Sequence, residues 1–151
     1  MSQSFLDHLQ PRQGGLSLLL NLRQPVEEHA KAIKAILLAE DAPKNTVAGL
    51  NQVGTVHFLR FLLINNDTQF MTITTFDGDF ERYVRDFAVV LNSILNPFFA
   101  HVEGSDDCLP IQKNPEEFLA FVRKYTVPNM VWYSAYPTPT ALEIRKHFEK
   151  E

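Results

Sequence analysis

Hydrophobic residues dominate two short runs in the middle of the chain, Val53 to Ile64 and Gln69 to Phe76. Both runs are rich in β-branched and aromatic residues, which predicts two strands. Residues 65–67 between them (Asn-Asn-Asp) are turn formers, so the pair predicts a hairpin. From Asp79 to Leu95 the apolar residues recur at helical spacing, which predicts an amphipathic helix with Asp77 or Asp79 as its N-cap.

The same two periodicities and the helix-start signals predict the remaining elements. Residues 1–14 are polar and predict a loose arm. The other predicted elements are a strand over residues 16–23, a helix from Pro25 that Pro43 ends, a polar connection over residues 41–52, a helix over residues 115–125, a strand over residues 129–136 and a last helix opened by the Thr140–Glu143 capping box.

This order of elements predicts an α+β fold of the ferredoxin-like βαββαβ type over residues 15–151. The sheet is expected to have four antiparallel strands, with an extra helix before the last strand and a further helix at the C-terminus. Both central strands are apolar on both faces, and helices of the same chain can cover only one face of their sheet. We therefore expect a homodimer in which the other face packs on a second sheet.

Composition narrows the class of partner. The chain of 151 residues is 45% hydrophobic and carries a formal net charge of −4, so it lacks the basic surface that nucleic acid requires. The sequence predicts no membrane segment and no signal peptide, since no apolar stretch is long enough. Cys108 is the only cysteine, which excludes an internal disulfide. A cytoplasmic location is the expectation that follows.

Two segments carry a resemblance to a known group of proteins. Val56 to Asp67 (VHFLRFLLINND) and Thr74 to Phe87 (TTFDGDFERYVRDF) resemble an uncharacterised bacterial branch of the dimeric α/β-barrel superfamily. In that superfamily two four-stranded ferredoxin-like sheets pack face to face and enclose a pocket. The resemblance implies a pocket enzyme, an oxidoreductase of the monooxygenase or peroxidase-like type.

The cofactor is left open by this resemblance. The haem-dependent dye-decolorising peroxidases of the wider group carry a GxxDG motif with a catalytic aspartate. Here Thr74 to Gly78 supplies the Asp-Gly pair at Asp77 but lacks the first glycine, and the chain is too short for the two repeats of those enzymes. Haem is the cofactor that the resemblance raises, and no motif for it is complete.

Arg60 is the one charged residue between Val53 and Asn66. An unpaired charge in a dry interior is costly, so its surroundings are informative. Three interpretations remain open: Arg60 extends to solvent from an edge strand, pairs with an acid such as Asp86, or binds an anion in the enclosed pocket. The second and third predict a shielded guanidinium.

His57 and Asp77 are the candidate catalytic residues, for proton transfer. His57 and Arg60 are three residues apart, so they lie on opposite faces of a regular strand unless a bulge intervenes. The alternatives are a structural histidine and a helix-capping aspartate. The other histidines, His8, His29, His101 and His147, show no metal-binding spacing, so no metal site is predicted.

Four further residues are candidates for ligand binding. Asn21 and Arg23 lie on the less apolar face of the first strand, where a pocket between sheets would be. Trp132 and Tyr136 share a face of the fourth predicted strand and suit either a dimer interface or a lid over an apolar ligand. The hypothesis is therefore a small-molecule enzyme, and the alternative is a non-catalytic ligand-binding or dimeric assembly protein.

Overall fold

Four strands form one antiparallel sheet in the computed structural model, which describes residues 12–149. The strands are β1 (Gln13–Asn21), β2 (Val56–Ile64), β3 (Gln69–Asp77) and β4 (Thr126–Val127), in the spatial order β2-β3-β1-β4. The helices are α2 (Val26–Leu37), α3 (Ala42–Val53), α4 (Phe80–Phe99), α5 (Pro115–Tyr125) and α6 (Ala141–Phe148), with short 3-10 turns at Asp106–Cys108 and Ile111–Lys113. The predicted α+β class is confirmed, and the architecture is consistent with a ferredoxin-like fold. The predicted arm over residues 1–14 lies mostly outside the described residues, and β1 begins within its last two.

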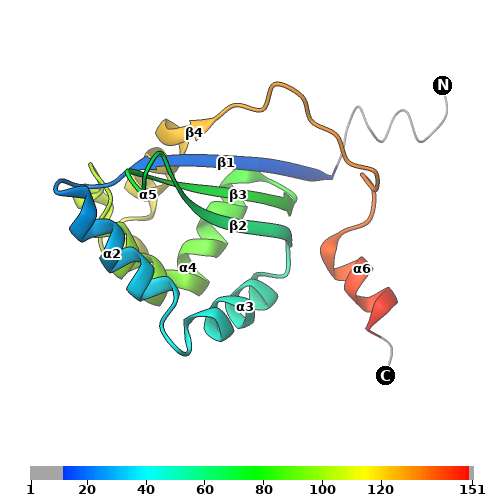
Figure 1. The fold of residues 1–151 in the computed structure, drawn as a ribbon. Coiled ribbons are helices and arrows are strands. Elements are labelled where there is room, and N and C mark those ends of the chain that lie inside the picture. Colours follow the sequence, from blue (N-terminus) through cyan, green and yellow to red (C-terminus); the bar gives the residue numbers. More distant parts are fainter. Residues whose placement is uncertain (1–11, 150–151) are drawn as a thin grey trace.

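The helices α2, α3 and α4 lie on one side of the sheet (Figure 1). Alternate residues of β1 and β3 point to that side and form the core with α4 and α5; they are Leu16, Leu18, Leu20, Phe70, Thr72, Thr74 and Phe76. Tyr83 and Leu91 of α4 are buried against them, as the helical spacing predicts, whereas Phe80 and Phe87 are half-buried. The sheet therefore has one side closed by its own chain.

The central hairpin is as the sequence predicts. β2 and β3 pair along their length, and residues 65–67 adopt the left-handed conformation that asparagine and aspartate tolerate in turns. The pairing has one irregularity, a bulge between Val56 and Phe58. It leaves His57 without a place in the regular ladder, at the end of the strand beside the last residue of β3.

The predicted polar connection over residues 41–52 is wrong, because most of it is helix α3. Pro43 does not end the preceding helix, which stops at Leu37, but sits in the first turn of α3. Proline is compatible with that turn because its missing N–H would have no intrahelical partner there. Gly54 closes the helix with a φ of 76°, and Gly49 lets the helix approach Leu91 of α4 closely.

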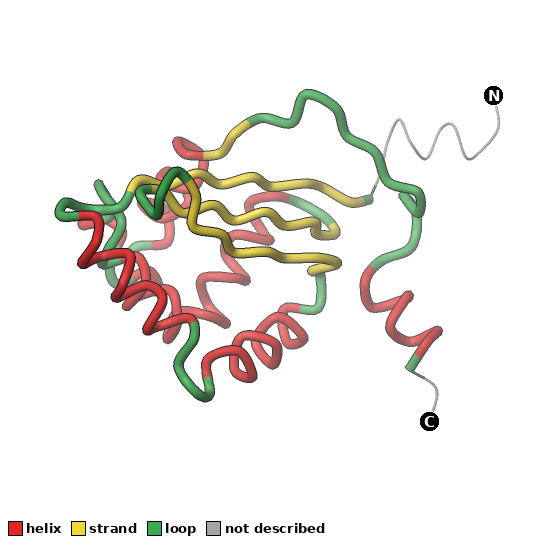
Figure 2. Tube along the Cα trace, viewed as in Figure 1, coloured by secondary structure: helices red, strands yellow, loops and turns green. Residues whose placement is uncertain are grey.

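The predicted strand over residues 129–136 is also wrong. The fourth strand is β4, two residues long, and it pairs with Ser17 and Leu18 of β1. After it the chain continues without helix or strand up to α6 (Figure 2). Aromatic residues favour a strand only where neighbouring strands provide side chains for them to pack against. Here proline flanks the segment at Pro128 and Pro137. Trp132 packs on Gly15 of β1, whereas most of the other large side chains of the segment are exposed.

The other side of the sheet is partly open. Leu19, Leu62, Met71 and Ile73 are half-buried there, and Phe58 is 75% exposed. Arg60 lies on the outer strand β2, is exposed and has no ion pair or hydrogen bond among residues 12–149. In the single chain this agrees with the first of the three interpretations, extension to solvent from an edge strand, and not with a pair to Asp86. Within these residues no helix is long and apolar enough to cross a membrane.

Candidate functional site

His57 and Asp77 form the shortest His–carboxylate contact in the described part of the chain. His57 Nε2 donates to Asp77 Oδ1 over 2.6 Å, and the two side chains are only 6% and 9% exposed. The hairpin register brings them together: Val56 is opposite Phe76, and the bulge turns His57 toward the next residue, Asp77. The sequence indicates both residues as candidate catalytic residues, but it does not predict that they pair.

The second carboxylate oxygen of Asp77 is also engaged. Oδ2 accepts a hydrogen bond from the backbone N–H of Ala141, the first residue of α6, over 2.7 Å. A carboxylate is favourable at a helix N-terminus, because the first N–H groups there have no intrahelical partner. Asp77 thus stays an acceptor on both oxygens and fixes the orientation of the imidazole. Of the two candidate N-caps of α4, Asp79 is the one that caps the helix: its Oδ2 accepts from Arg82 N–H over 3.0 Å.

The remaining ring nitrogen of His57 is free. Nδ1 has no hydrogen-bond partner among residues 12–149. It is not fully buried, since it is absent from the buried atoms that lack a partner. His57 lies in the wall of a groove of about 750 Å³, here called the dyad groove, between the end of the sheet, the segment 132–136 and α6. In the neutral imidazole that donates Nε2–H to Asp77, Nδ1 presents a lone pair, as a general base requires.

Aromatic residues form much of the dyad groove. Phe58, Trp132, Tyr133 and Tyr136 line it, and Tyr136 is 72% exposed. Trp132 packs so closely on β1 that a Cβ on Gly15 would lie 2.5 Å from its ring. The indole Nε1 of Trp132 is buried with no partner among the described residues. The segment is held by Gln13, whose Nε2 donates to the carbonyl of Tyr136 over 2.7 Å.

One cation borders the dyad groove. Arg145 of α6 lines it, and its Nε lies 3.2 Å from Glu149 Oε1, an exposed pair of small energetic value. An anionic group entering the groove can therefore compete for Arg145. The sequence does not predict that Arg145 and Gln13 lie at this groove. The predicted capping box that begins α6 is confirmed.

The other predicted ligand-binding residues lie elsewhere. Arg60 is on the open sheet face, two residues beyond Phe58, and does not line the groove. Asn21 is at the opposite end of β1 from Gln13, where its Oδ1 accepts from Gln69. Arg23 donates to Asp106 over 2.7 Å and to Ser105 over 3.2 Å. The predicted site residues therefore separate into three places, and only His57, Asp77, Trp132 and Tyr136 meet at one.

His29, His101 and Cys108 lie away from the dyad groove. His29 and His101 face each other with their Nδ1 atoms 2.9 Å apart, and burial, followed by the charges of His29 and Arg23, lowers the pKa of His101. Burial raises the pKa of the Cys108 thiol to about 11, so it is unreactive at neutral pH. Among residues 12–149 no three His, Cys, Asp or Glu side chains gather to hold a metal ion.

The dyad groove does not suit haem ligation by His57. The nitrogen farther from the histidine backbone, Nε2, is committed to Asp77. The free nitrogen, Nδ1, is adjacent to Cβ, where the main chain crowds a broad planar macrocycle. The residues present therefore do not fit a haem held by this histidine, and no step through haem is derived.

Comparison of the chain with families of known proteins, with curated proteins and with solved structures finds no match.

Proposed function

We propose that the dyad groove binds a small organic molecule and that His57, oriented by Asp77, accepts or donates a proton in its conversion. One observation carries this proposal: a nearly buried histidine uses one nitrogen for a carboxylate and leaves the other without a partner in the wall of a groove. Nδ1 is not one of the fully buried atoms that lack a partner, so a molecule in the groove can reach it. The free nitrogen supports a chemical role.

The reaction class follows from the two side chains. His57 Nδ1 takes a proton from a C–H, O–H or N–H group of the substrate and becomes imidazolium, whose Nε2–H remains bonded to Asp77. Asp77 stabilises that cation and keeps the ring in place, as in carboxylate–histidine pairs generally. The proton returns from Nδ1 to another atom of the substrate, so the enzyme ends unchanged. Nothing in the groove identifies a redox group, so the oxidoreductase type stays a prediction.

The walls suggest the substrate class. Four aromatic side chains line the groove, and an aromatic ring stacks favourably on such surfaces. Arg145 provides a cation for a carboxylate once it leaves Glu149. We therefore infer a planar aromatic substrate with an acidic hydrogen, with or without a carboxylate.

Solvent deuterium exchange tests the proposal. A panel of small aromatic ketones and keto acids, phenylpyruvate among them, is titrated while the fluorescence of Trp132, the only tryptophan, reports binding. Bound compounds are then followed by NMR in D2O. The expected result is enzyme-dependent exchange that falls by about 10²–10⁴-fold in His57→Gln, the range for loss of a general base. His147→Gln on the exposed side of α6 is the matched control and should exchange like the wild type.

Equal exchange in His57→Gln and the wild type would refute the catalytic role. Binding with no exchange for any compound would instead favour the alternative, a non-catalytic binding or assembly protein. The open sheet face supports that alternative, because Phe58 and Arg60 are exposed there beside half-buried apolar residues.

A further inference from the structure

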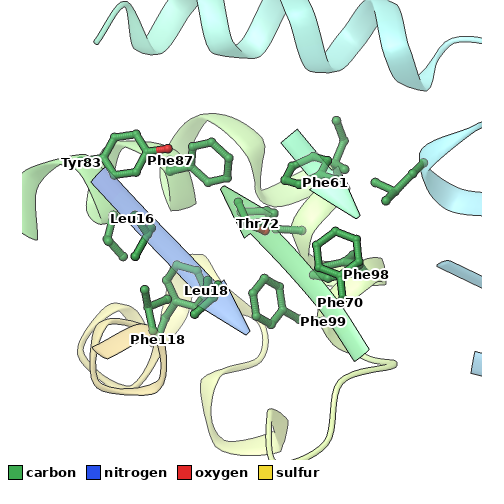
Figure 3. Close-up of a pocket in the computed structure, with 15 residues that line it drawn as sticks. Leu16, Leu18, Phe61, Phe70, Thr72, Tyr83, Phe87, Phe98, Phe99 and Phe118 are labelled. Atoms are coloured by element: carbon green, nitrogen blue, oxygen red, sulfur yellow. The ribbon is translucent and has the colours of Figure 1, made fainter. Parts of the chain in front are cut away.

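A small cavity lies in the core on the helix side of the sheet, away from the dyad groove (Figure 3). Its volume is about 50 Å³, and its wall is almost wholly aliphatic and aromatic. Leu16, Leu18 and Thr72 face it from the sheet, and Phe98, Phe99 and Phe118 from the helices (Figure 3). A water molecule needs two to four polar partners, which this wall does not supply.

The cavity adjoins an apolar groove at the surface. This groove, of about 560 Å³, runs between α2, α3 and the outer strand β2. Leu37, Phe61 and Phe70 line both spaces. Leu38 and Val47 in the groove are 74% and 58% exposed, so apolar surface there stays in water unless something covers it. The groove alone is within the usual size range of small-molecule sites.

One polar group in the cavity wall lacks a partner. The hydroxyl of Thr72 has no hydrogen bond among residues 12–149, although the residue is only 8% exposed. Thr74, two residues along the same face, differs: its hydroxyl lies 3.0 Å from that of Tyr83 and is satisfied. The Thr72 oxygen is not one of the fully buried atoms that lack a partner, so it keeps accessible surface with which a ligand can form a hydrogen bond.

Charge restricts the ligand further. Lys34 is the one charged residue lining the outer groove, and its Nζ is already 2.7 Å from Asp67 Oδ2. No unpaired charge among the described residues therefore borders the groove or the cavity. A carboxylate or an ammonium group would lose hydration there without gaining a partner.

We infer that this groove and cavity bind a neutral, elongated apolar molecule with one hydrogen-bonding oxygen, an aliphatic alcohol or ketone, whose oxygen reaches the Thr72 hydroxyl. The alkyl part lies between Leu37, Phe61 and Phe70 and covers Leu38 and Val47. This site is separate from the dyad groove, so it stands whether or not His57 is catalytic.

Calorimetric titration of the full chain with octan-1-ol, n-octane and octanoate tests the site. We expect saturable binding of octanol. Octane should bind roughly tenfold more weakly, the value of one hydrogen bond, and octanoate should also bind more weakly because its charge loses hydration. Thr72→Val should remove the preference of octanol over octane. Thr74→Val is the matched control, since it deletes a neighbouring buried hydroxyl that does not face the ligand, and it should keep the preference.

A blocked entrance provides the second test. Leu37→Trp should abolish octanol binding, and Val89→Trp, at a 68% exposed position of α4 outside both spaces, should not. Methyl NMR of the wild-type chain gives a test that does not depend on whether the variants fold. Octanol should shift the methyl resonances of Thr72 and Leu37 and leave that of Thr75 unchanged. Equal affinity for octanol and octane, no saturable binding, or methyl shifts confined to other residues would each overturn the inference.

Discussion

Asp77 joins three elements through one carboxylate, since it accepts from His57 of β2 and from Ala141 of α6 while ending β3. Asp77→Asn keeps one acceptor and replaces the other with a donor, so one of the two N–H groups loses its partner. We expect the free energy of unfolding to fall by about 1–3 kcal/mol, the cost of one such group. Asp79→Asn is the control, because asparagine caps a helix as well as aspartate. Equal losses in denaturant melts would contradict the assigned roles.

His101 predicts a pH dependence of stability. Burial and the neighbouring His29 and Arg23 lower its pKa in the folded chain, and Asp106 faces Arg23 in turn. The unfolded chain then binds the proton more readily than the folded one. The stability contributed by this group is fully present above the ordinary histidine pKa of about 6.5, and it is lost below that as the pH falls through the lowered pKa of the folded chain. Melts from pH 8 to 5 should show a drop that His101→Gln reduces and His147→Gln leaves intact.

The chemistry of single residues indicates His57 and Asp77 as candidates, but it does not predict that they pair. Their pairing depends on the bulge and on the hairpin register, which a regular alternation does not encode. The surroundings of Arg60 are not predictable from its apolar neighbours in sequence, because these alternate between two faces and the face that Arg60 occupies is open in the single chain.

Helix α6 depends on local capping as well as on Asp77. Thr140 accepts from Glu143 N–H over 3.2 Å, and the Glu143 carboxylate accepts from Thr140 N–H over 3.0 Å. Thr140→Ala should cost about 0.5–2 kcal/mol locally. Hydrogen exchange should therefore accelerate in α6 and leave the amides of β1 and β3 unchanged, because the sheet does not rest on this helix. Uniform acceleration throughout the chain would contradict an independent α6.

The elements with strong local signals were predictable, and those set by tertiary contacts were not. The hairpin, α4, α5 and the α6 capping box follow from periodicity and start signals. The sequence does not predict helix α3, because a proline such as Pro43 can end one helix or occupy the first turn of the next. The segment 129–136 has strand-forming residues, yet Gly15 offers Trp132 a packing surface instead of a paired strand.

For the whole molecule we predict a homodimer through the open sheet face. Leu19, Leu62, Met71 and Ile73 are half-buried in the single chain, and Phe58 is 75% exposed. A second sheet packed on this face would bury them and enclose Arg60. Light scattering should give twice the chain mass of 17.3 kDa at micromolar concentration, and Phe58→Glu should weaken the dimer. Val89→Glu on α4 is the control. A mass of one chain at every concentration would refute the dimer.

We propose that Asp77 holds the neutral imidazole of His57 as the Nε2–H tautomer and leaves Nδ1 free to act as a base. Long-range ¹H–¹⁵N NMR of the imidazole measures this directly, since the two nitrogens have different shifts when protonated and unprotonated. We expect one tautomer for neutral His57, with Nε2 protonated and Nδ1 not, and a loss of that preference in Asp77→Asn. A protonated Nδ1, or an equal mixture of tautomers in the wild type, would refute this role of Asp77.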